Sequence, residues 1–152
     1  MDKIIKIGII CIGLFMLLSA IPSRTEVIHV PQTQKETLIN TIVRVAKEEG
    51  IKPSHLLGQA MAESSIREHV IGDGGCSKGV TQINICANPQ AKSVIGNTEA
   101  ELRWTADKLK SYGYDKGYIT LAFAKYNAPR MINYKYAKSV LNYSKDFTQY
   151  DN

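Results

Sequence analysis

One glutamate, and the polar residues that follow it, form the part of this sequence best suited to chemistry. Glu63 ends an apolar segment that begins at Leu56, and a glycine-rich stretch, residues 72–79, comes soon afterwards. The group Val80-Thr81-Gln82-Ile83-Asn84 completes the region. Partial burial disfavours the charged form of a carboxyl group and raises its pKa, as general acid catalysis requires. We therefore predict a cleft around Glu63.

Helical spacing indicates how Glu63 would be placed. Leu56, Leu57, Ala60 and Met61 form one apolar stripe. At about 100° per residue, Glu63 lies about 20° from Leu56 around the helix axis, at the margin of the buried face. The spacing alone leaves a second interpretation open, in which Glu63 ends a frayed helix and is exposed to water.

The elements expected to position this region are mainly helical. Apolar periodicity predicts helices over 35–49, from Pro53 to about Glu63, and over roughly 99–112, 118–126 and 132–143. Thr33 is expected to cap the first helix, and Asn97 or Thr98 the one that begins near residue 99. Trp104 is expected in the core, with sugar stacking as its alternative role. Strand signals are weak except for a possible small hairpin at residues 79–85.

The first 23 residues differ from the rest of the chain. A short, mostly basic start precedes an apolar run from Ile7 to Ile21, which is the pattern of a secretory signal peptide. The run is short for a membrane span, which needs about 20 apolar residues, although an uncleaved N-terminal anchor remains the alternative. Residues 24–34 are interpreted as a linker and residues 35–148 as one domain. The protein is thus expected to be exported to the periplasm, cell wall or extracellular space.

Charge and cysteine content agree with export. The whole chain carries a net charge of +5. Without residues 1–23, which contain two lysines and one aspartate, it carries +4. A basic exported domain suits anionic partners such as cell-wall polymers or phospholipid headgroups rather than nucleic acid; a solvated surface without a partner is the alternative. Cys76 and Cys86 are predicted to form a disulfide, with free thiols left open. The histidines lack the ligand spacing of a zinc site.

Three motifs in this order resemble the lysozyme-like lytic transglycosylases, the family that includes goose-type lysozymes. Ala62-Glu63-Ser64-Ser65 is similar to the catalytic glutamate-serine pair of the family. Ser77-Lys78-Gly79-Val80-Thr81-Gln82-Ile83-Asn84 looks like its Gly-Leu-Met-Gln-Ile-Asn group, and Tyr126-Asn127-Ala128 like its Ala-Tyr-Asn-Ala-Gly segment. The resemblance covers roughly residues 35–143 and implies a lysozyme-like, bilobal helical domain.

The resemblance also implies roles for individual residues. Glu63 would be the general acid and base, and Gln82 and Asn127 would line the sugar subsites. Tyr126 would form a hydrogen bond near Glu63 and orient it. Ser64 and Ser77 would support the cleft and contribute to substrate binding. No metal or organic cofactor is implied, and the expected form is a monomer that meets the membrane only through its N-terminal segment.

Three departures from the family pattern are expected to alter substrate fit. Thr81 stands where methionine is usual, which would remove an apolar contact with the sugar. Ser65 replaces a common glycine after the glutamate-serine pair, and Pro129 replaces the glycine after Asn127-Ala128. Glu63 and the Tyr126-Asn127 pair are retained.

The implied substrate is the peptidoglycan strand, cleaved between N-acetylmuramic acid and N-acetylglucosamine. In a lytic transglycosylase the C6 hydroxyl of the muramyl sugar attacks and a 1,6-anhydro product forms. Asp73 keeps hydrolysis open, because the segment Gly72-Asp73-Gly74-Gly75 is similar to one in goose-type lysozymes whose acidic residue positions water. Asp is also a common turn former, so the alternative role of Asp73 is to shape the turn. A non-catalytic wall-binding protein is the alternative of a different class.

Overall fold

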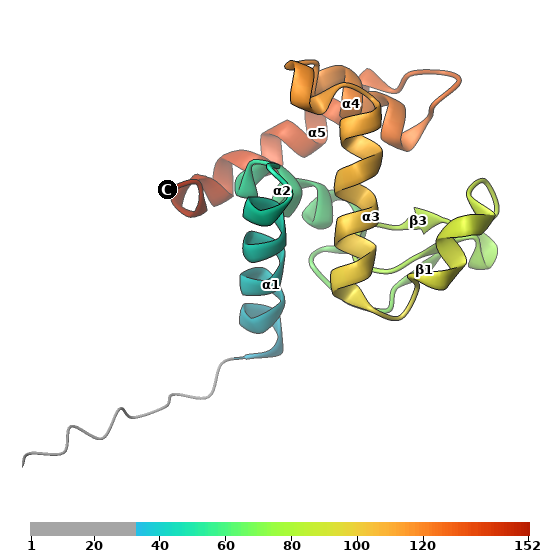
Figure 1. Cartoon of the computed structure of the whole chain (residues 1–152), viewed down its shortest axis with the longest axis horizontal. Coiled ribbons are helices and arrows are strands. Elements are labelled where there is room, and N and C mark those ends of the chain that lie inside the picture. Colours follow the sequence, from blue (N-terminus) through green and yellow to red (C-terminus); the bar gives the residue numbers. More distant parts are fainter. Residues whose placement is uncertain (1–32) are drawn as a thin grey trace, which may run out of the picture. The chain divides into compact units, whose positions relative to one another are not determined.

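The computed structural model describes residues 33–152, and they are mainly helical, as predicted (Figure 1). The predicted signal peptide or anchor and almost all of the linker lie outside the described residues. The five α-helices are α1 (Gln34–Glu48), α2 (Pro53–Ser64), α3 (Thr98–Ser111), α4 (Ile119–Asn127) and α5 (Tyr134–Ser144). Short 3-10 turns cover Asp73–Gly75, Pro89–Ser93, Tyr114–Lys116 and Lys145–Tyr150. None of the helices within residues 33–152 is both long and apolar enough to cross a membrane.

The helix boundaries follow local sequence signals. The Thr33 side chain accepts a hydrogen bond from the Glu36 backbone N–H at 3.2 Å, so it caps α1 as predicted. The side chain of Asn97 does the same for α3, accepting from the Ala100 N–H at 3.0 Å. Pro53 occupies the first turn of α2, where its missing N–H costs nothing. These caps fix where the helices that flank Glu63 begin.

A small antiparallel sheet joins α2 to α3. Its strands are β1 (Ile71–Gly72), β2 (Ser77–Lys78) and β3 (Ile83–Asn84), in that order. The predicted hairpin over 79–85 therefore corresponds to β2 and β3, but it begins two residues earlier and is extended by β1. Two-residue strands cannot show the alternation that identifies a strand in a sequence, which explains the missed β1.

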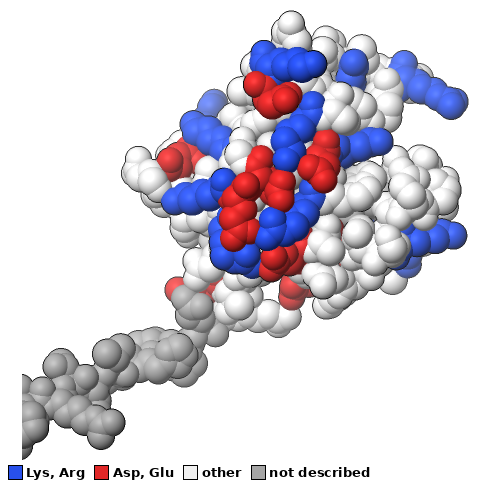
Figure 2. Space-filling view, in the orientation of Figure 1, with Lys and Arg blue, Asp and Glu red and all other residues white. Residues whose placement is uncertain are grey.

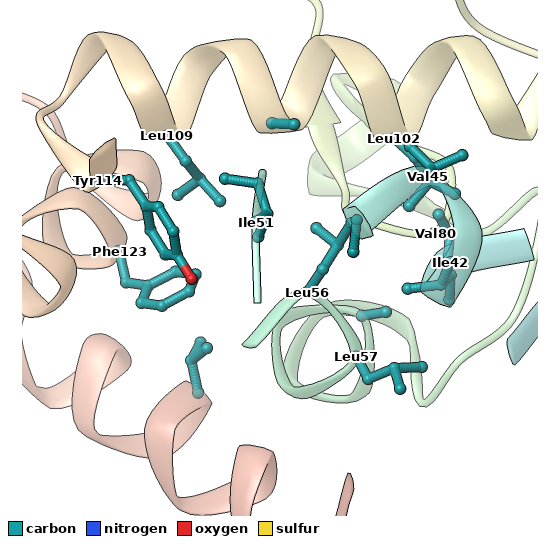
Figure 3. Close-up of a cluster of buried hydrophobic side chains, with 14 of the residues drawn as sticks. Ile42, Val45, Ile51, Leu56, Leu57, Val80, Leu102, Leu109, Tyr114 and Phe123 are labelled. Atoms are coloured by element: carbon teal, nitrogen blue, oxygen red, sulfur yellow. The ribbon is translucent and has the colours of Figure 1, made fainter. Parts of the chain in front are cut away.

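The hydrophobic core lies among helices α1 to α5. Figure 3 shows Ile42 and Val45 of α1 facing Leu56 of α2 and Leu102 of α3, with Phe123 at the opposite end of the cluster. All buried members of this core fall between Leu38 and Val140. Residues 31–152 also form one compact unit, so we expect this part of the chain to fold without the residues that precede it.

Helices α2 and α5 pack against each other at very short range. A Cβ at Gly58 would lie 2.6 Å from the Val140 carbonyl oxygen and 2.4 Å from Ser144 Oγ. Only glycine fits at this contact. The close approach brings the start of α5 to the end of α2, where Glu63 lies.

Candidate active site

A cleft of about 380 Å³ lies at the end of α2. Its walls come from the sheet region, from α3 and from the end of α4. The lining residues are Glu63, Asp73, Ser77, Gln82, Asn84, Ala87, Asn88, Trp104, Lys108, Tyr112, Tyr126, Asn127 and Pro129. Six of the seven residues predicted for the site, all except Ser64, are thus brought together from segments up to 64 positions apart in the sequence.

Glu63 is partly buried at one side of this cleft. Its Oε1 accepts a hydrogen bond of 2.6 Å from the Tyr136 hydroxyl on α5. Burial raises the pKa of Glu63 to about 7, and the negative charge of Asp73 acts in the same direction, whereas the Tyr136 hydrogen bond opposes the rise. Glu63 is therefore not an exposed residue at a frayed helix end. Near neutral pH it is available in both the protonated and the ionised form.

Tyr126 was predicted to form a hydrogen bond near Glu63 and to orient it, but its hydroxyl bonds to other residues. The Tyr126 hydroxyl donates to the Thr81 carbonyl oxygen at 3.0 Å and lies 3.3 Å from Thr105 Oγ1. Tyr126 lines the cleft and ties α4 to the loop after β2. Tyr136 takes the role instead, because the close packing of α5 on α2 carries its hydroxyl to the carboxyl group. The Tyr136 contact spans 73 positions, so no local sequence signal indicates it.

Gln59 lies one helical turn before Glu63 and is completely buried. Neither its amide nitrogen nor its amide oxygen has a hydrogen-bond partner among residues 33–152. Burial and the Glu63 charge raise the pKa of the nearby Tyr136 hydroxyl well above its usual value. The Gln59 amide is close enough to oppose that rise but does not reach hydrogen-bond geometry with the hydroxyl. A buried amide without a partner costs stability, which is tolerated more often at functional sites than in an ordinary core.

Ser64 is buried and supports the cleft from behind. Its Oγ donates to the carbonyl oxygen of Val80 at 2.8 Å and accepts from the Arg67 N–H at 3.1 Å. The end of α2 is therefore attached to the loop between β2 and β3. Ser64 does not line the cleft, so the structure gives it a supporting position rather than a substrate contact.

Asp73 and Ser77 form a pair on the sheet side of the cleft. Ser77 Oγ donates to Asp73 Oδ2 at 2.5 Å across the tight turn between β1 and β2. Asp73 is exposed and lines the cleft, and its charge affects Glu63. Asp73 thus shapes the turn, which is one of its two predicted roles, and it also faces the cleft, which the other role requires.

Gln82 is held in one orientation. Its Nε2 donates to the carbonyl oxygens of Val70 and Gly79, at 3.0 and 2.9 Å. Its Oε1 lies so close to Gly72 that a Cβ there would be 2.4 Å away. The Gln82 backbone has a positive φ of 49°, which few residues other than glycine adopt. Strain of this kind is common where a functional side chain must be aimed.

Thr81 was predicted to leave the sugar without an apolar contact that the usual methionine would make, and this stays a prediction. Its side chain is fully buried, and its Oγ1 lies 2.7 Å from Thr105 Oγ1. Thr81 does not line the cleft. The hydroxyl pair joins the β2–β3 loop to α3 within the core.

The far wall of the cleft carries amides and aromatic rings. Asn127 is exposed, and its Oδ1 accepts from Asn133 Nδ2 at 2.8 Å. Trp104 was expected in the core, but it is only partly buried and lines the cleft. The Lys108 ammonium group lies 5.6 Å from the centre of its ring and 5.4 Å from that of Tyr112. Ring faces of this kind suit stacking with sugars.

The predicted disulfide is confirmed, since Cys76 and Cys86 are bonded. The bond closes a ten-residue separation that contains β2, β3 and the strained Gln82. Cross-linking a loop of this size reduces the entropy of the unfolded chain. The disulfide therefore stabilises the wall that carries Ser77 and Gln82.

Within residues 33–152 there is no cluster of three or more His, Cys, Asp or Glu side chains able to hold a metal ion. Comparisons of the chain with protein-family models, with curated proteins and with solved structures find no match. The function is therefore inferred from the cleft itself and from the motifs in the sequence.

Proposed function

We propose that this protein cleaves peptidoglycan glycan strands, with Glu63 as general acid and then general base. The observation that carries the proposal is the carboxyl group of Glu63. It is partly buried in a cleft, its pKa is raised to about 7, and a tyrosine hydroxyl holds it in place. A carboxylic acid that keeps its proton near neutral pH can protonate a glycosidic oxygen. The helical domain with its small sheet is compatible with a lysozyme-like, bilobal fold.

The proposed reaction has two steps. Neutral Glu63 protonates the oxygen that bridges N-acetylmuramic acid and N-acetylglucosamine, and an oxocarbenium-like centre develops on the muramyl sugar. Glu63, now ionised, then accepts the proton of the C6 hydroxyl as that oxygen attacks, and a 1,6-anhydro ring forms. The reaction needs no water, because the proton that Glu63 gives to the leaving group is replaced by the proton of the C6 hydroxyl.

Tyr136 supports both steps of this mechanism. Its hydroxyl donates to Glu63 Oε1, so it stabilises the carboxylate after the first proton transfer. The same hydrogen bond fixes the direction of the carboxyl group and leaves Oε2 for the substrate. Burial and the hydrogen bond shift the pKa of Glu63 in opposite directions, which keeps it near the value that suits both an acid and a base.

The other walls of the cleft suit a sugar polymer. Gln82, Asn84 and Asn127 present amide groups, which can exchange hydrogen bonds with hydroxyl and N-acetyl groups. Trp104 and Tyr112 add aromatic rings to the lining. This combination of fixed amides and aromatic faces supports a carbohydrate rather than a compact charged substrate.

Hydrolysis is the second candidate reaction, and the placement of Asp73 in the cleft favours it. Asp73 lines the same cleft as Glu63, and only its Oδ2 is engaged by Ser77. Oδ1 can therefore hold a water molecule, which would replace the C6 hydroxyl as the attacking group. A lysozyme would result.

Digestion of purified sacculi tests the proposal. Residues 24–152 and the variant Glu63→Gln would be incubated with sacculi, and the released muropeptides identified by mass spectrometry. Anhydro products that disappear in the variant support a lytic transglycosylase, and products heavier by one water support a lysozyme. If the wild type binds sacculi but releases nothing, the enzymatic proposal is wrong and a wall-binding protein remains.

A further inference from the structure

The segment from Lys116 to Lys145 has a different charge from the rest of the domain. It contains six lysines or arginines and no Asp or Glu. The remaining residues of 33–152 have ten lysines or arginines and twelve Asp or Glu, so they carry a net charge of −2. The excess positive charge of the domain therefore lies in α4, α5, the loop that joins them and the residues next to these two helices.

Carboxylates within residues 33–152 do not neutralise the cations of this segment. None of the six forms an ion pair with another residue in the range 33–152, in contrast to Arg44, Lys52, Arg103 and Lys110 elsewhere. Lys135 and Lys138 lie on the outer face of α5 and, with Ser139, Asn142 and Tyr143, line a shallow groove. Free cations on an exposed helix face favour an anionic partner.

Large apolar side chains are exposed beside these cations. Met131 in the α4–α5 loop is 85% exposed, and Tyr134 at the start of α5 is 57% exposed. Arg130 and Lys135 flank them in the sequence. Such side chains gain free energy only if something covers them, and a polyphosphate or another purely ionic polymer offers no apolar phase to do so.

We propose that the surface formed by Arg130, Met131, Tyr134, Lys135 and Lys138 docks onto a lipid bilayer that contains anionic phospholipids. Met131 would enter the boundary between headgroups and acyl chains, Tyr134 would lie at the interface, and the cations would contact headgroup phosphates. This α4–α5 surface would be a membrane contact in addition to the one expected from the N-terminal segment. It does not depend on the proposed reaction.

The position of the surface relative to the cleft gives the docking a consequence. Asn127 and Pro129 line the cleft, and Arg130 follows directly in the same loop. A bilayer at the α4–α5 surface would therefore lie close to one rim of the cleft. Glycan strands next to the membrane would be presented to the site in preference to distant ones.

Vesicle co-sedimentation of residues 24–152, which include the complete core but not the apolar run Ile7–Ile21, tests this proposal. The probes are vesicles of phosphatidylcholine alone and of phosphatidylcholine with an equal part of phosphatidylglycerol. We expect binding to the anionic vesicles only. Lys135→Glu/Lys138→Glu should weaken it by more than about tenfold, since each cation near an anionic surface contributes about fivefold in affinity.

The matched control is Lys35→Glu/Lys92→Glu, which makes the same change in net charge at two exposed lysines outside the segment. It should keep most of the binding. Met131→Ser/Tyr134→Ser leaves the charge unchanged and should weaken binding by about tenfold if these side chains enter the bilayer. Circular dichroism and thermal unfolding would verify that every variant is folded.

Three results would overturn the proposal: no binding to anionic vesicles, an equal loss in the control pair, or full binding by Met131→Ser/Tyr134→Ser. The last result would mean a purely ionic contact, as expected for a soluble anionic polymer. Because sacculus digestion contains no lipid, the two experiments fail independently.

Discussion

Two glutamates of this domain, Glu63 and Glu99, have opposite surroundings. Glu63 is partly buried, has one neutral hydrogen-bond partner, and has a pKa raised to about 7. Glu99 is near the start of α3 at the surface, where Arg44 and Arg103 lower its pKa to about 2. The difference shows that burial and neighbouring groups decide whether a glutamate is a proton donor or a permanent anion.

The surroundings of Glu99 extend across the face shared by α1 and α3. Arg103 contacts Glu48, Glu49 and Glu99, and Arg44 contacts Glu48 and Glu99. Figure 2 shows the resulting patch, in which positive and negative side chains alternate. Lys110 also pairs with Glu49, so three cations balance three carboxylates in this ladder of ion pairs. These ion pairs attach α1 to α3, whereas the Glu63 carboxyl group in the cleft stays available for proton transfer.

The largest expected effect separates the two glutamates by activity. Glu63→Gln keeps the shape of the side chain but cannot donate and accept the proton, so sacculus digestion should fall by about a thousandfold or more. Glu99→Gln removes a charge of the same type from the surface and should leave the rate within about twofold. Equal losses in the two variants, with both proteins folded, would contradict the role of Glu63.

The second prediction concerns the partner of Glu63. Tyr136→Phe removes a hydrogen bond that lowers the pKa of Glu63, so the pKa should rise further. The high-pH limb of the digestion rate should move to higher pH, and the maximal rate should fall by about ten- to a hundredfold because the carboxyl group loses its orientation.

Tyr126→Phe is the matched control for that experiment. It removes the hydrogen bond to the Thr81 carbonyl oxygen and should lower stability while it leaves the pH limb nearly in place. If Tyr126→Phe shifts the limb and Tyr136→Phe does not, the assignment of the partner is wrong.

The third prediction concerns stability and pH. The pKa of Glu63 is higher in the folded state than its usual value of 4.5, so the folded state binds more protons than the unfolded state between about pH 4.5 and 7. The contribution of Glu63 is complete below about pH 4.5 and is lost as the pH rises through 7. The free energy of unfolding should fall over this range by at most about 3 kcal/mol, and Glu63→Gln should abolish that fall.

Glu99 should show the opposite sign. Its pKa is lower in the folded state, so its contribution is present above the unfolded value and is lost as the pH falls toward 2. Denaturant unfolding of Glu99→Gln at several pH values would check this. The stability difference between wild type and Glu99→Gln should shrink as the pH falls. A difference that grows in acid would contradict this prediction.

The smallest expected effect belongs to the ladder between α1 and α3. Arg103→Gln should lower the midpoint of thermal unfolding slightly in low salt and should match the wild type in high salt, since exposed ion pairs contribute little and are screened. Digestion activity should not change. A large, salt-independent loss would mean that the ladder does more than attach two helices.

Local signals were sufficient to predict the helices and much of the cleft. Thr33, Pro53 and Asn97 are capping or first-turn residues whose effect depends on a few neighbours, so they indicate helix starts reliably. The angular position of Glu63 also follows from its own helix. The cysteine pair was predicted from its spacing across a glycine-rich loop in a chain expected to be exported.

Contacts between distant segments could not be predicted in the same way. Tyr136 reaches Glu63 only because Gly58 allows α5 to approach α2, and that approach is a property of two helices rather than of either sequence. The Thr81 hydroxyl contacts Thr105 in the core, 24 positions away, and no local pattern indicates that contact. β1 is too short to leave a pattern.

The contact at Gly58 acts as a spacer that sets the geometry of the proton donor from a distance. Residues near Gly58 meet α5 at Val140 and Ser144, while Glu63, further along α2, meets Tyr136 at the opposite end of the same interface. Any widening at the glycine would tilt or shift α5 and lengthen the hydrogen bond on Glu63. The acidity of the cleft is thus coupled to the distance between two helix backbones, and substitutions in the core can change the working pH range of the site without touching it.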